Sequence, residues 1–221
     1  MTAIQRVSAG RRFKDRLVQT LVHLSFAIAV VPLIAVLWMV VKNGLARFDM
    51  EFLTHSMRNI GARDAGGGAY HAILGTLEQV LLASAISVPI GLLTAIYLVE
   101  YGQGGRLSRA ISFFVDVMTG IPSVVSGLFI LAFWILALGM PFSGFAGALA
   151  LSILMMPTVV RSAEEMLRLV PGDLREASYA LGVPKWRTIT RIVLPTAFSG
   201  IVTGVMLAIA RVAGETAPLL L

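Results

Sequence analysis

The sequence predicts an all-α membrane protein in which several helices cross the bilayer. Of its 221 residues, 57% are hydrophobic and only 14% are charged, and the mean hydropathy is +0.85. A soluble domain of this length has no interior large enough to bury so many apolar side chains. The apolar residues also occur in runs of about 20, the length that an α-helix needs to cross roughly 30 Å of hydrocarbon.

The first third of the chain predicts one anchor and one external loop. Residues 1–20 are basic, with five arginines and lysines against one acid, and we expect them in the cytoplasm. Residues 21–41 form the first transmembrane anchor, which stays uncleaved because no small-residue cleavage site follows it. Residues 42–71 are polar and form the external loop. Their glycines, Gly66–Gly68, lack the strand and the Gly-Lys-Ser/Thr sequence of a phosphate-binding loop.

Residues 72–221 are predicted to form the transmembrane domain proper. Four further spans are expected at residues 72–99, 111–138, 145–160 and 192–218. Thirteen lysines and arginines fall in the predicted inside segments, at residues 1–20, 100–110 and 161–191, and four fall in the external loop. The positive-inside rule therefore predicts a cytoplasmic amino terminus, with segment 161–191 as a cytoplasmic loop.

Composition excludes several classes of function. The chain has no cysteine, and its three histidines have no ligand-like spacing, so we predict no metal site. The net charge of +6 comes from cations that flank the apolar runs, which is typical of membrane topology and does not indicate nucleic-acid binding.

A short polar helix is predicted between the fourth and fifth spans. Asp173 can cap its start, with Glu176 three residues later completing a capping-box pattern. Gly182 suits the left-handed residue after a helix, and Pro184 suits the first turn of the next helix. One face of this helix is small and apolar, and its members recur at helical spacing: Leu174, Ala177, Ser178 and Leu181.

This small face has two interpretations. The helix can lie on the membrane with Trp186 at the interface, or it can dock into a groove of another protein. The segment resembles the EAA loop of ABC importer permeases. The matching positions are Glu176, Ala177, Ser178, Gly182, Leu194 and Pro195. The resemblance implies a coupling helix seated in a cleft of an ATP-hydrolysing subunit. Ser178 stands where that family more often has alanine, and we expect little consequence.

An arginine and a glutamate lie deep in the fifth predicted span. Arg211 is about 24 Å along the helix from Pro195, and Glu215 is four residues further on the same face. An arginine inside a membrane is costly, so it should face protein or a watery path. The pair can be structural only, or it can line an anion pathway, because a guanidinium offers five donors suited to phosphate oxygens.

The third predicted span contains helix breakers. Gly120, Pro122 and Gly127 occur in it together with Ser123. Close packing through small residues and a bend that exposes polar groups to the pathway both explain this pattern. Ser123 is the candidate pathway residue here. Asp116, nearer the cytoplasmic end, is expected to pair with a neighbouring helix.

The stretch from Arg211 to Leu219 is similar to that of PstA-type permeases of bacterial phosphate importers, as are Gly120–Gly127, Gly75-Thr-Leu and Tyr97–Tyr101. This resemblance implies the type I ABC importer permease fold, location in the bacterial inner membrane, and inward transport of inorganic phosphate. It also implies four kinds of partner: ABC ATPase subunits that use ATP and magnesium, a PstC-like sister permease, an external phosphate-binding protein, and lipid. That family normally has a sixth span, so we expect the chain to be truncated at its carboxyl terminus.

Three rival functions follow from the residues. An ABC importer permease for another oxyanion or small solute shares every feature except the arginine–glutamate stretch. An ATP-independent channel or carrier shares the apolar spans. A membrane enzyme is the least favoured class, because no nucleophile, base and metal set converges at one depth.

Overall fold

The structure is a computed structural model that describes residues 9–61, 66–102 and 104–220, and over these residues all regular structure is helical. The chain divides into two compact units, Met1–His71 and Ala72–Leu221. Four helices are long and apolar enough to span a membrane, and a bent pair of helices can supply a fifth span. The predicted all-α class is confirmed.

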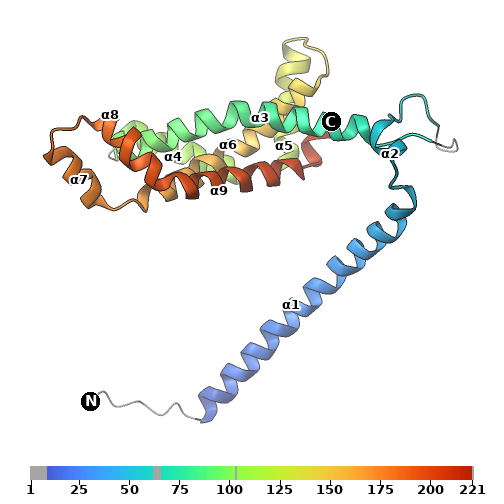
Figure 1. Cartoon of the computed structure of the whole chain (residues 1–221), viewed down its shortest axis with the longest axis horizontal. Coiled ribbons are helices and arrows are strands. Elements are labelled where there is room, and N and C mark those ends of the chain that lie inside the picture. The colour runs from blue at the N-terminus through green and yellow to red at the C-terminus, as the bar shows by residue number, and fades with distance from the viewer. Residues whose placement is uncertain (1–8, 62–65, 103, 221) are drawn as a thin grey trace. The chain divides into compact units, whose positions relative to one another are not determined.

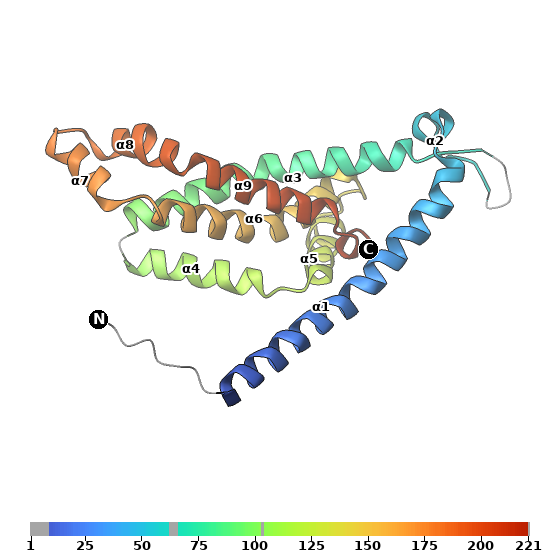
Figure 2. The same ribbon diagram turned by 60° about the horizontal axis from the view of Figure 1, so that its bottom comes forward.

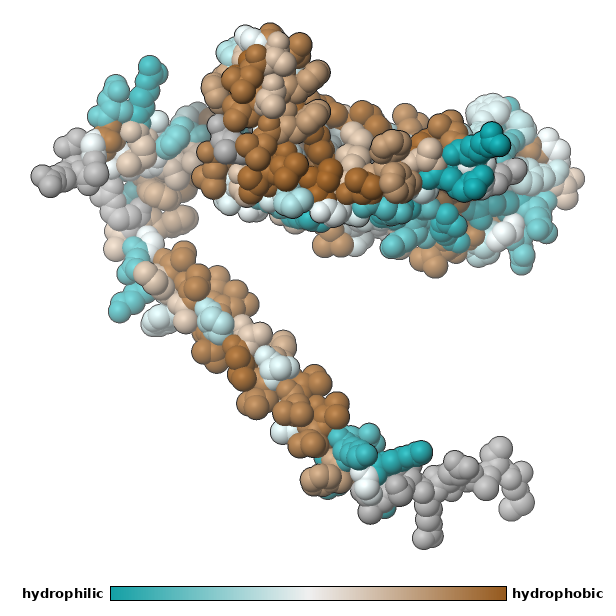
Figure 3. Space-filling model, turned by 180° about the vertical axis from the view of Figure 1, so that it is seen from behind, coloured by the Kyte–Doolittle hydropathy of each residue, from teal (hydrophilic) through white to brown (hydrophobic). Residues whose placement is uncertain are grey.

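The first unit is dominated by α1, Ala9–Gly44, which extends the predicted anchor in both directions. None of the residues in its most apolar segment is buried, and its surface is hydrophobic along most of its length (Figure 3). The predicted external loop holds a short helix, α2, Met50–Thr54. Asp49 caps α2 by accepting a hydrogen bond from the Phe52 backbone N–H at 2.7 Å.

The second unit contains the remaining helices, three of which include a π-helical segment. In chain order they are α3 (Tyr70–Ile96) with η2 (Tyr97–Tyr101), α4 (Arg106–Thr119), α5 (Ser123–Ile130) with η3 (Leu131–Ala137), α6 (Gly144–Arg168), α7 (Gly172–Ala180), α8 (Lys185–Thr188) with η4 (Ile189–Val193), α9 (Leu194–Ala213) and the 3₁₀ turn η5 (Ala217–Leu219).

The core of this unit lies between α3, α6 and α9, which run side by side (Figure 1). One cluster joins the first half of α3 to the centre of α6 and the last half of α9, around Ala83, Met155 and Ala208. A second joins the opposite halves, around Ala95, Leu167 and Val193. The α3 and α6 helices are therefore parallel, and α9 is antiparallel to both.

The two ends of this bundle differ in character. One end carries α7 and α8 and is here called the α7 end; hydrophilic side chains gather there (Figure 3). The opposite end carries Ser143, which caps α6, and Glu215, and is here called the Glu215 end. The α6 helix continues to Arg168, beyond the predicted end of the fourth span at residue 160, and α9 stops at Ala213, before the predicted end of the fifth at residue 218.

The predicted third span is not one continuous helix. The α4 and α5 helices meet at an angle of 104°, with Gly120 ending α4 and Pro122 preceding α5 (Figure 2). Proline lacks the backbone N–H that a continuing helix needs, so the helical hydrogen bonds stop here. Gly127, predicted as a third break, lies inside α5 instead. A side chain at Gly127 would lie 2.6 Å from the Pro218 carbonyl oxygen, so glycine is needed for close packing against η5.

Candidate functional site

The loop between α6 and α9 reverses the chain through a left-handed glycine. Gly182 has φ +73°, and the backbone N–H groups of Gly182 and Val183 donate to the carbonyls of Tyr179 and Ser178. These bonds close the end of α7 as predicted. The predicted cap is wrong: Pro171 precedes α7, and Asp173 lies inside its first turn, where a negative charge still suits the helix amino terminus.

The predicted small face of α7 is partly exposed and partly buried. Leu174, Ala177 and Leu181 are exposed, and so is Glu176. Ser178 is only 3% exposed, and its hydroxyl shares a hydrogen bond of 2.8 Å with that of Thr188 on α8. The exposed residues remain available to another protein, whereas Ser178 joins the two short helices. Little consequence was expected of this serine; the structure gives it a bond that alanine cannot make.

We expect Ser178→Ala to loosen the α7–α8 turn by about 1 kcal/mol, the usual net contribution of one hydrogen bond. Hydrogen–deuterium exchange of the α7 amides in membranes measures the effect as faster exchange. Thr190→Ala is the matched control, because within the described part of the chain the Thr190 hydroxyl bonds to carbonyls of its own helical segment, those of Trp186 and Arg187. Equal exchange in Ser178→Ala and wild type would contradict the prediction.

The end of the EAA-like segment leads into α9. Leu194 and Pro195 follow directly on the π-helical segment η4, within one helix that runs from Lys185 to Ala213, so the proline removes one backbone donor from this helix. Leu194 packs against the core cluster that contains Val193 and Leu167, and Pro195 is exposed. Leu194 therefore anchors the loop to the bundle.

Sequence reasoning missed a buried ion pair beneath α7. Arg175 donates from Nε and Nη2 to Oε1 of Glu100, at 3.0 and 2.8 Å. Its Nη1 and Nη2 also donate to the carbonyls of Val170 and Leu167, at 2.7 and 2.9 Å. Glu100 is only 5% exposed. An acid next to the end of a predicted span was the available signal, but its partner is 75 residues away in the sequence.

A second charged group lies nearby, between α4 and α6. Arg161 contacts both Asp116 and Glu164, and Arg168 contacts Glu164 at 2.7 Å. The expected pairing of Asp116 with a neighbouring helix is thus confirmed. Arg161 lies within α6, because the helix extends beyond residue 160 into the segment predicted to be cytoplasmic. Among the described residues, no group of three or more acids and histidines forms a potential metal site.

Arg211 and Glu215 lie at the Glu215 end. Arg211 is in the last turn of α9, and its Nε is 4.0 Å from Oε1 of Glu215; the two side chains are 59% and 21% exposed. Glu215 is beyond the end of α9, so the predicted shared helical face is wrong, although the two residues remain adjacent. A cavity of about 280 Å³ next to Glu215 is also lined by Thr76, Gln79 and Thr216, which the sequence did not indicate.

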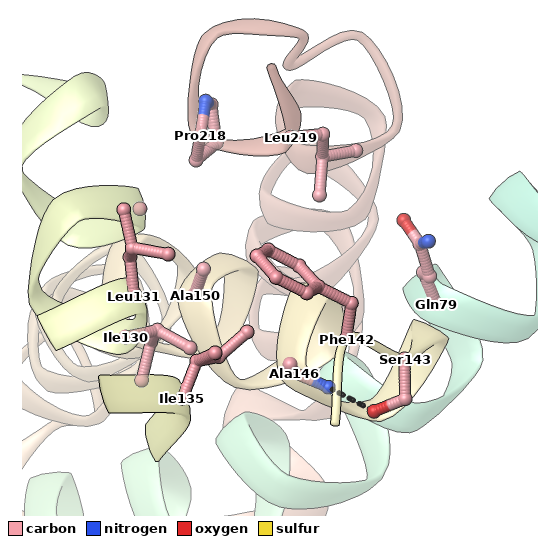
Figure 4. A pocket seen from close by; sticks show the side chains of 12 residues that line it. Gln79, Ile130, Leu131, Ile135, Phe142, Ser143, Ala146, Ala150, Pro218 and Leu219 are labelled. Carbon is pink, nitrogen blue, oxygen red and sulfur yellow. Dashed lines mark hydrogen bonds between the residues drawn. The ribbon is translucent and has the colours of Figure 1, made fainter. Parts of the chain in front are cut away.

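The third candidate pathway residue lies at the start of α5. Ser123 is half-buried and follows the break at Gly120–Pro122; its carbonyl accepts a hydrogen bond from the buried Ser126 hydroxyl at 2.7 Å. A cavity of about 180 Å³ is lined further along α5 by Gly127, and across from it by Gln79 and Pro218 (Figure 4). Gln79 therefore borders both cavities.

Comparison with known proteins shows which family the chain belongs to. Residues 87–221 match the family described as binding-protein-dependent transport system inner membrane component. The chain belongs to this inner membrane component family. It is 54% identical to the phosphate transport system permease protein PstA 1 of Mycobacterium tuberculosis (strain CDC 1551 / Oshkosh), over 95% of this chain and 69% of that protein. Identity is 51% with the Mycobacterium leprae PstA, over 98% and 71%, and 41% with that of Yersinia pestis, over 100% and 74%.

Solved structures agree on the fold. A chain of the MetNI methionine ABC transporter in an inward-facing conformation superposes with a TM-score of 0.56, over 66% of this chain and 68% of that one, at 22% identity. At this identity the likeness shows the fold alone, the ABC importer permease fold. Family membership makes the chain a multi-pass inner membrane component of a binding-protein-dependent transport system.

Proposed function

We propose that this chain is the permease subunit of an ATP-driven importer that carries inorganic phosphate into the cytoplasm. The observation that carries the proposal is its identity of 54% and 51% to two permeases named for phosphate transport, over almost all of its length. The pairing of Arg211 with Glu215, which lines a cavity together with the polar side chains of Thr76, Gln79 and Thr216, adds a chemical reason.

Arg211 and Glu215 have complementary chemistry for phosphate. The guanidinium offers donors in a planar fork that matches phosphate oxygens. Glu215 moderates its positive charge, so that an anion passes and does not remain bound, and it accepts a hydrogen bond from a protonated phosphate. Ser123 is proposed as a further polar group of the pathway. Because Arg211 is 59% exposed on this chain alone, a second permease chain is needed to shield it from lipid.

The partners follow from this assignment. We place the amino terminus and the α7 end in the cytoplasm, where Glu176, Ala177 and Leu181 on the exposed side of the α7 turn face an ABC ATPase subunit. A PstC-like sister permease completes the pathway, and an external phosphate-binding protein delivers phosphate at the Glu215 end. ATP and magnesium are used by the ATPase, and this chain binds no cofactor. ATP binding closes the ATPases and opens the pathway outward; hydrolysis resets it.

Competition measures the proposed substrate directly. In proteoliposomes that contain the complete transporter and binding protein, we expect excess sulfate and molybdate to leave uptake of labelled phosphate almost unchanged, whereas unlabelled phosphate abolishes it. Strong inhibition by either foreign anion would instead indicate an importer for another oxyanion. Uptake that persists without the ATPase subunits would indicate a channel or carrier.

A further inference from the structure

The guanidinium of Arg175 joins three helices at the α7 end. It belongs to α7, it is paired with Glu100 in the π-helical end of α3, and it donates to the carbonyls of Leu167 and Val170 at the end of α6. Carbonyls at a helix end have no partner within their own helix. Arg175 therefore caps α6 and neutralises Glu100 at the same time.

Burial makes this contact strong and directional. The side chains of Arg175 and Glu100 are 19% and 4% exposed, so water competes little for either charge. Removing one partner of such a pair leaves an uncompensated buried charge. Lysine could not replace the arginine fully, because one ammonium does not have the planar fork that bonds Glu100 and two carbonyls together.

The position of the pair matters as much as its strength. Ser178 joins α7 to α8 and so to α9, whereas Arg175 joins α7 to α3 and α6. At this end of the bundle, α3 continues into the π-helical segment Tyr97–Tyr101, and α9 is preceded by the π-helical segment Ile189–Val193. Such segments are frequent at functional sites. A displacement of α7 thus reaches α3 through Arg175, and it reaches α6 both through Arg175 and through the short backbone link between Arg168 and Gly172.

We infer that Arg175 and Glu100 form a positioning pair that makes α3 and α6 follow α7 when the ATPase displaces it. This inference rests on the proposed function, because it takes α7 to be the helix that the ATPase moves. Neither residue touches phosphate or ATP. Their role is to keep ATP hydrolysis coupled to opening of the pathway.

The ratio of phosphate imported to ATP hydrolysed tests the inference in the complete transporter with its binding protein in proteoliposomes. We expect Arg175→Gln and Glu100→Ala to lower this ratio roughly tenfold per assembled complex, within the usual range of coupling between sites. Arg175→Lys should lower it less. ATPase activity should remain, with an unchanged KM for ATP, because the ATPase itself is intact.

Arg168→Gln is the matched control. Arg168 is also an arginine at the α7 end with a carboxylate partner, but it is 64% exposed, and Glu164 keeps its contact with Arg161 when Arg168 is removed. The control should retain the wild-type ratio. An unchanged ratio in assembled Arg175→Gln complexes would overturn the inference.

Two further results separate coupling from simple folding. If Arg175→Gln does not assemble, Arg175→Lys and Glu100→Gln decide the matter: a wild-type ratio in both assigns the pair a structural role only and overturns the inference. If the wild-type complex hydrolyses ATP but imports no phosphate, the proposed function fails instead. The wild-type arm thus distinguishes the two failures.

Discussion

Arg211→Ala is expected to reduce phosphate uptake by at least about 100-fold in proteoliposomes of the complete transporter. One charge-assisted hydrogen bond to the anion is lost, a contribution of about 1.5–3 kcal/mol. The variant also leaves Glu215, 4.0 Å away in the native pair, as an uncompensated negative charge beside the cavity. Both changes oppose the passage of an anion, so uptake falls further than either change predicts alone.

Membrane insertion of this variant should be normal, because alanine is cheaper than arginine inside a bilayer. Arg109→Ala is the control: Arg109 is another exposed arginine, on α4, and its loss should leave uptake within about twofold of wild type. The double variant Arg211→Ala/Glu215→Ala separates the two roles of the pair. If it restores uptake, the pair is structural and Arg211 has no role in the pathway.

Much of this fold follows from hydropathy alone. Apolar runs fix the existence of α1, α3, α6 and α9, because lipid requires about 20 apolar residues per span. The left-handed conformation of Gly182 is equally predictable from the sequence, since a left-handed residue between two helices is most often glycine. These features are local, and a single sequence is sufficient to predict them.

The errors have a common physical origin. Hydropathy registers the apolar run over 111–138 but not the direction of the chain, so the sequence predicts a bend near Gly120–Pro122 without its angle of 104°. Gly127 resembles a break in the sequence but serves packing against Pro218, a contact over 91 residues. Tertiary contact, and not helix propensity, determines the role of each such glycine.

In the candidate site, too, contacts between sequence neighbours could be predicted and contacts between distant residues could not. Arg211 and Glu215 are near neighbours in sequence, so their proximity was predictable even though the end of α9 was not. The partners of Arg175 are not predictable, because Glu100 is 75 residues away and the carbonyls of Leu167 and Val170 become acceptors only once α6 has ended. Long-range pairing requires the packed structure.

Gly182→Ala is expected to reduce phosphate uptake and phosphate-stimulated ATPase activity about tenfold. At φ +73° an alanine costs roughly 1–2 kcal/mol, so the turn moves toward another conformation and α7 no longer presents Glu176 and Ala177 to the ATPase in one orientation. The cost comes from the backbone alone, because among the described residues no atom other than those of its chain neighbours lies within 4 Å of the position of the new methyl group.

Gly182→Asn separates backbone conformation from steric contact with the ATPase. Asparagine is larger than alanine but adopts the left-handed conformation far more readily, because its side chain bonds locally to the backbone. If the turn conformation matters, Gly182→Asn should retain uptake within about twofold of wild type while Gly182→Ala does not. If the space above Gly182 matters because the ATPase closes against it, the order reverses. Full activity in both variants would remove the glycine turn from the coupling mechanism, since neither its conformation nor its open space would then be required.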